Sequence, residues 1–135
     1  MNVIRFGTGA EYIEIGVPHM HKGRDWIDIA VSIVVPSFQG SIKASVEPGD
    51  FEAFAANLRS LYQSLQGKAE FNNRERQFTL SLAAATGGHV HVTGEAWSHA
   101  TYGNKLTFVL ELDQSYLLSP LRELESLFAH SQSEA

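Results

Sequence analysis

The chain has 135 residues, of which 44% are hydrophobic and 19% charged, a composition that indicates one packed domain over residues 1–135 and excludes a disordered segment. It contains no cysteine, which excludes disulfides, thiolate metal ligands and a cysteine nucleophile. The formal net charge of −5 disfavours nucleic-acid binding and favours a basic protein partner.

The first half of the chain predicts four strands. Residues 3–6 and 12–17 are short β-type runs joined by a glycine-containing turn, and a polar loop over residues 18–25 follows them. Apolar side chains recur at the odd-numbered positions of residues 27–35, so we expect a strand with that face toward the core. Alternation resumes after Pro36-Ser37, and the positions expected to face the core are Phe38, Gly40, Ile42, Ala44 and Val46.

Residues 47–67 predict a long amphipathic helix. Pro48 suits a first helical position, Asp50 places negative charge in the first turn, and Gly67 is expected to end the helix. Apolar side chains recur at helical spacing on one face, at Phe51, Phe54, Ala55, Leu58, Leu61, Tyr62 and Leu65.

The second half repeats this order of strands followed by a helix. We expect inward-facing alternation over residues 69–71, 78–82, 90–96 and 106–112, with Ser119 as the cap and Pro120 as the first residue of a C-terminal helix. The buried face of that helix is expected to hold Leu121, Leu124, Leu127 and Phe128. The predicted fold class is α+β, an antiparallel β-sheet of about seven to eight strands with meander and hairpin connections and two amphipathic helices on its apolar face.

His89 and His91 stand two residues apart on a predicted strand and therefore share one face. They are the candidate metal ligands, with Asp113 or Glu111 to complete a set. If the hairpin closes symmetrically over residues 98–104, however, His91 faces Glu111 and His89 faces Asp113, as ordinary cross-strand pairs on a solvated face. We therefore expect no metal and no cofactor, and keep a ligand- or metal-binding His89/His91 face as the alternative function.

A polar sheet face is the candidate binding surface. The chain has no Gly-x-Ser-x-Gly motif, and its paired carboxylates fall on solvent-facing helix positions, so we do not expect an enzyme. An outward tryptophan among polar side chains is typical of a protein-binding face. The residues expected to lie side by side on neighbouring strands are Thr93, Glu95, Trp97, Thr107 and Glu111.

Residues 1–16 lack the basic and apolar regions of a secretory signal, and the most apolar stretch, residues 27–35, is interrupted by Asp28 and Ser32. We therefore expect a cytoplasmic protein that does not contact a membrane and that is a monomer or a weak homodimer.

Three passages resemble the WapI family of bacterial immunity proteins: GSIKASVEPGDFEAFAANLRSLYQSLQGKAEF, GHVHVTGEA and NKLTFVLELDQSYLLSPLREL. The resemblance implies a non-enzymatic, cytoplasmic immunity protein. Such a protein binds and neutralises the toxic C-terminal domain of a bacterial contact-dependent or polymorphic toxin. Its partner is then that cognate toxin domain and not a nucleic acid.

Overall fold

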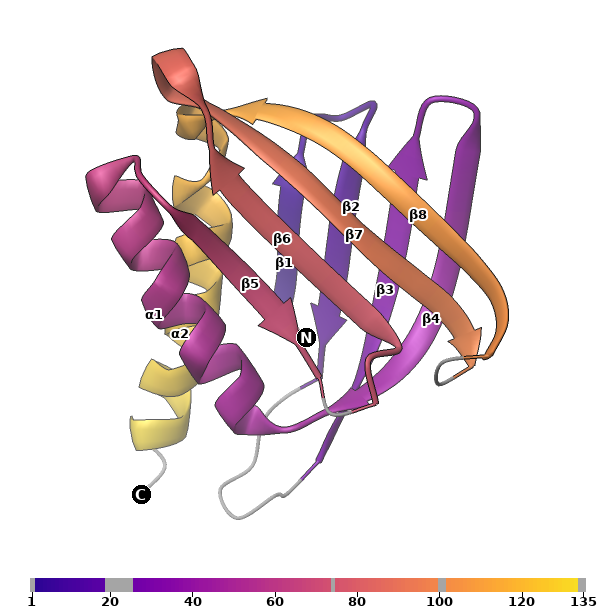
Figure 1. The fold of residues 1–135 in the computed structure, drawn as a ribbon. Helices are drawn as coiled ribbons and strands as arrows, with labels where there is room; N and C mark the ends of the chain where they lie inside the picture. The colour runs from indigo at the N-terminus through magenta and orange to yellow at the C-terminus, as the bar shows by residue number, and fades with distance from the viewer. Residues whose placement is uncertain (1, 19–25, 74, 100–101, 134–135) are drawn as a thin grey trace.

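In the part of the chain that the structure describes, eight strands form two antiparallel sheets of four strands each (Figure 1). The structure is a computed structural model that describes residues 2–18, 26–73, 75–99 and 102–133. In both sheets the strands lie side by side in sequence order, so the antiparallel α+β fold with hairpin connections is confirmed, with its strands divided between two sheets instead of one. The first sheet contains β1 (Asn2–Gly7), β2 (Tyr12–Val17), β3 (Ile27–Val35) and β4 (Phe38–Val46). The second contains β5 (Lys68–Asn72), β6 (Phe78–Ala84), β7 (His89–His99) and β8 (Tyr102–Asp113).

Each sheet is followed by one long helix, α1 (Pro48–Ser64) after β4 and α2 (Leu118–Ser133) after β8. Short 3-10 turns, η1 (Thr86–Gly88) and η2 (Gln114–Tyr116), precede β7 and α2. α1 packs against β5, α2 packs against β1, and the two helices contact each other on one side of the molecule (Figure 1). Arg59 of α1 donates from Nε to Glu125 of α2 at 3.0 Å, which fixes the two helices to each other.

The inward faces of both sheets and both helices share one hydrophobic core. Phe54 of α1 lies 6.0 Å from Phe6 of β1 and 5.6 Å from Phe71 of β5, between ring centroids. Leu58 and Leu61, on the same helical face, are also buried. α1 therefore joins the two sheets, because its buried face contacts side chains from an edge strand of each.

α1 ends earlier than its sequence predicts. Leu65 adopts a left-handed backbone with a φ of 56°, and its N–H donates to the Leu61 carbonyl at 2.8 Å. Its side chain is 38% exposed. The predictions that Gly67 ends the helix and that Leu65 is buried are therefore wrong; Gly67, with a φ of 80°, lies in the following turn to β5.

α2 begins at Leu118, two residues before the predicted first position, because η2 leads directly into it. Pro120 fits within this first turn, where backbone N–H groups have no partner inside the helix. Leu121, Leu124 and Leu127 are buried as predicted. The side chain of Phe128 and residues 19–25 of the expected polar loop lie outside the described residues.

The inward positions of β4 are covered unevenly. Ala44 and Val46 are buried, Gly40 and Ile42 are half-buried, and Phe38 is 65% exposed. Phe38 has the inward parity that was predicted for it, but it is not buried, because it lies at the end of the β3–β4 hairpin, and this end extends past β8 (Figure 1).

Candidate functional site

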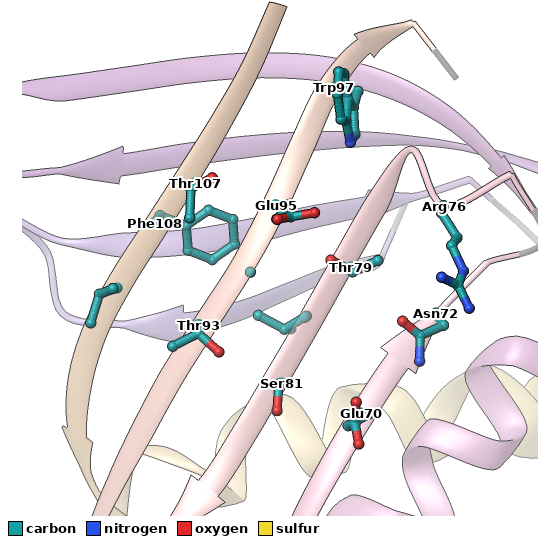
Figure 2. Close-up of a pocket in the computed structure, with 13 residues that line it drawn as sticks. Glu70, Asn72, Arg76, Thr79, Ser81, Thr93, Glu95, Trp97, Thr107 and Phe108 are labelled. Atoms are coloured by element: carbon teal, nitrogen blue, oxygen red, sulfur yellow. The ribbon is translucent and has the colours of Figure 1, made fainter. Parts of the chain in front are cut away.

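The outer face of the second sheet is polar where its inner face is apolar. Strand pairing places Glu95 of β7 between Thr79 of β6 and Thr107 of β8. In the same way, Thr93 of β7 lies between Ser81 of β6 and Val109 of β8. Figure 2 shows the threonine, serine and glutamate side chains of this group on β6, β7 and β8, where the alternation of each strand directs them away from the core.

This face contains a shallow hollow of about 650 Å³. Four of the predicted binding residues, Thr93, Glu95, Trp97 and Thr107, line it together. Glu111 does not line the hollow, although it belongs to the same face of β8. The polar side chains that line it and were not predicted as site residues are Glu70, Asn72, Arg76, Thr79 and Ser81. For the four on β5 and β6, outward parity was the available signal, but only the register between strands shows that they meet β7. Arg76 lies in the turn between these strands, where parity gives no signal.

A cation already lies beside the predicted acidic and aromatic residues. The Nζ of Lys105 is 3.5 Å from Glu95 Oε2 and 5.1 Å from the centroid of the Trp97 ring. The Glu95 and Lys105 side chains are 45% and 39% exposed. The face is therefore mixed in charge, and Glu95 attracts a partner's cation less than an isolated carboxylate would.

The backbone of Trp97 is held at two points by one residue. Its N–H donates to the Gln77 carbonyl at 2.9 Å, and its carbonyl accepts from Gln77 Nε2 at 3.2 Å. Gln77 itself is buried. The tryptophan ring is thus presented from a fixed backbone, which reduces the entropy that a partner would have to remove on binding.

Gly94 permits the close packing beneath this face. A Cβ built at Gly94 would lie 2.4 Å from a ring atom of Phe108 and 2.4 Å from the Thr79 carbonyl oxygen. No side chain fits there, so the Phe108 ring lies directly against the β7 backbone.

The histidine pairs occur as predicted from the hairpin register. His91 faces Glu111, with Nδ1 3.5 Å from Oε1, and His89 faces Asp113. Hydrogen bonds from Ser115 hold the pKa of Asp113 below its ordinary value, and the nearby His89 adds a smaller effect in the same direction. Within the described residues, no group of three His, Asp or Glu side chains is placed to hold a metal ion.

Neither helix, over its described residues, is long and apolar enough to cross a membrane.

Similar folds occur in solved structures of very different sequence. The crystal structures of MRP1/MRP2 from "trypanosoma bruciei" include a chain with a TM-score of 0.54 and 10% identity, aligned over 98% of this chain and 84% of that one. This likeness concerns the fold alone. The CdiA-CT/CdiI toxin and immunity complex from Enterobacter cloacae includes a chain with a TM-score of 0.48 and 11% identity, aligned over 90% of this chain and 99% of that one. Similarity at that level supports no further argument.

A comparison with curated proteins found no match. Family assignment comes from the sequence itself, because residues 4–131, nearly the whole chain, match the immunity protein WapI-like family. This match covers all eight strands but for the first residues of β1, together with both helices almost to their ends. The chain therefore belongs to the WapI-like family of immunity proteins.

Proposed function

We propose that this protein is a non-enzymatic immunity protein that binds and neutralises the toxic C-terminal domain of a bacterial contact-dependent or polymorphic toxin. Membership of the immunity protein WapI-like family is the observation that carries this proposal. On this account the protein acts in the cytoplasm and inhibits its partner by occupying it, with no turnover of its own.

We assign the inhibitory surface to the outer face of the second sheet. Supporting this choice are the hollow, the fixed presentation of Trp97, and the exposed carboxylates of Glu95 and Glu111. An aromatic anchor surrounded by polar groups is the arrangement on which binding free energy usually concentrates. The net charge of −5 suits a toxin domain with a basic active-site cleft.

Co-expression in bacteria tests the proposal. The toxic domain encoded beside this gene is expressed alone, with the parent protein, and with the variants Trp97→Ala and Glu95→Lys. We expect the parent to restore growth and both variants to protect less well, because Trp97→Ala removes the anchor and Glu95→Lys adds a second cation beside Lys105.

Two results would count against the proposal in different ways. If cells die despite soluble parent protein, the toxin is not the partner. If both variants protect as well as the parent, the protein is an immunity protein that binds through another surface.

A further inference from the structure

The outer edge of β8 is a second candidate contact beside the hollow. Two of the four edge strands, β1 and β5, pack against α2 and α1. At the far end of β4, Asn73 Nδ2 donates to the Ser45 carbonyl at 3.2 Å. β8 spans 12 residues and is the longest edge strand. A long unpaired edge is a template for an added strand.

The backbone groups on that edge follow from the hydrogen bonds of β7. The Trp97 N–H donates to Gln77, so odd-numbered residues of β7 point toward β6 and even-numbered ones point toward β8. The register pairs even residues of β7 with even residues of β8. The N–H and C=O groups of Thr107, Val109 and Glu111 therefore point away from β7. Among the described residues, no backbone hydrogen bond joins these three to another element.

An apolar side chain lies where an added strand would run. A Cβ built at Gly40 would be 3.4 Å from Leu106 Cδ2, so β8 passes over β4 at this point. Phe38 stands two residues nearer the hairpin end, on the same inward face of β4, and is 65% exposed. Figure 1 shows that this end of the β3–β4 hairpin extends past β8. A strand added to β8 would cover Phe38 with its inward side chains.

We propose that the edge of β8 and the exposed Phe38 together receive an extended segment of the toxin domain, which becomes a fifth strand of the second sheet. This inference rests on the function proposed above and adds the manner of binding. The segment would alternate, with apolar side chains turned toward Phe38 and at least one basic side chain on the outer face opposite Glu111. The Glu111 side chain is 73% exposed, and opposite charges on neighbouring strands attract.

A second copy of this chain does not fit the same site. The inward side chains of its β8 are already covered by its own first sheet, since Phe108, Leu110 and Leu112 are buried. The occupant must therefore be a strand whose inward face is bare before binding.

Proline substitutions test the outer edge of β8 and the outer edge of β4 separately. Val109→Pro removes an outward N–H from β8 and leaves the ladder to β7 intact. The matched control is Ser41→Pro on β4, because the bond from Asn73 to Ser45 shows that odd-numbered residues of β4 also point outward. Phe38→Ser removes the apolar contact without touching either ladder. Thermal unfolding verifies that each variant is folded.

Affinity is measured by titration calorimetry against the purified toxic domain encoded beside this gene. We expect Val109→Pro and Phe38→Ser each to bind at least about tenfold more weakly than the parent, and Ser41→Pro to bind as the parent does. In the complex of the parent protein, the amide hydrogens of Thr107, Val109 and Glu111 should exchange with solvent more slowly than in the free protein. This measurement tests the inference even if Val109→Pro does not fold.

Parent-like binding by folded Val109→Pro, or unchanged exchange at the three amides, would overturn this inference and leave the proposed function standing. Failure of the parent itself to bind would overturn both.

Discussion

Trp97 is the residue on which binding is expected to depend most. Its backbone is fixed by Gln77 and its ring lies beside Lys105 at the edge of the hollow. Trp97→Ala should cost about 2 kcal/mol or more of binding free energy, mainly as a faster dissociation rate. Surface plasmon resonance with the toxic domain measures the dissociation rate. The control is Tyr116→Ala, which removes an exposed aromatic ring from η2. Equal dissociation rates for the two variants would remove Trp97 from the interface.

Asp113 gives the fold a stability that depends on pH. Because hydrogen bonds from Ser115 lower its pKa in the folded protein, the carboxylate stabilises the fold above its unfolded pKa of about 3.9, and this contribution is lost as pH falls through the folded value. Asp113→Ala should therefore be less stable than the parent at pH 7 and approach it in acid.

Urea unfolding between pH 7 and pH 2 measures that difference. Asp113→Asn is the control, because it keeps an oxygen that accepts from the Ser115 N–H but has no proton to gain. A stability difference between parent and Asp113→Ala that does not change with pH would show that this carboxylate has the same pKa in both states.

At the scale of elements, α1 is the helix that holds the two sheets together. Leu58 is fully buried in the core, so Leu58→Ala should reduce the free energy of unfolding by roughly 2 to 5 kcal/mol. Leu65→Ala changes the same residue type at the 38% exposed position that directly follows the last helical residue, and should cost far less. Equal shifts in the denaturation midpoint for both variants would contradict the assignment of the buried face.

β7 and β8 pack closely at Gly94, where there is no room for a side chain. Gly94→Ala would force the new methyl group against the Phe108 ring and the Thr79 carbonyl, and should destabilise the fold by about 1 to 3 kcal/mol. Gly9→Ala is the matched control, because a Cβ at Gly9 would meet no atom within 4 Å. Thermal unfolding compares the two variants. A midpoint unchanged by Gly94→Ala would show that the Phe108 ring and the Thr79 carbonyl can shift to admit a methyl group, and would contradict the close packing assigned to Gly94.

The elements were predictable from the sequence because burial alone fixes the alternation of a strand and the apolar face of a helix. The sheet that each strand joins was not predictable from the sequence. Parity assigns a side chain to one face of its strand, but it does not say what covers that face. Phe38 illustrates this limit, because it follows the inward pattern of β4 yet is exposed, at the hairpin end that extends past β8 (Figure 1).

The candidate site was predictable to the same extent. The residues of β7 and β8 were aligned correctly because these strands are consecutive in the chain and their pairing is regular from His89 to Trp97, before the irregularity between Trp97 and His99. The hollow is also lined from β5 and the turn after it, by Glu70, Asn72 and Arg76. No local sequence pattern specifies the register of β5 and β6 with β7, so these residues could not be placed beside the predicted ones.

At the scale of the whole molecule, the two halves have the same order of four strands and a helix, and share one core. The second half presents the hollow and the long edge of β8 side by side, because both belong to the second sheet. A bound toxin domain can then contact the outer face of that sheet and extend a strand along its edge. Both contacts lie away from the helices, so binding need not disturb the core.

If the proposed function is right, this protein inhibits a toxin domain by binding it, without turnover. The most direct test is the residual activity of the purified toxic domain, measured against increasing molar amounts of this protein and at several incubation times. The account predicts that activity falls in proportion to added protein, reaches its minimum at one equivalent and does not change with time. Inactivation that proceeds with time at substoichiometric amounts would indicate catalysis, and undiminished activity at excess would show that this domain is not the partner; either result would contradict the account.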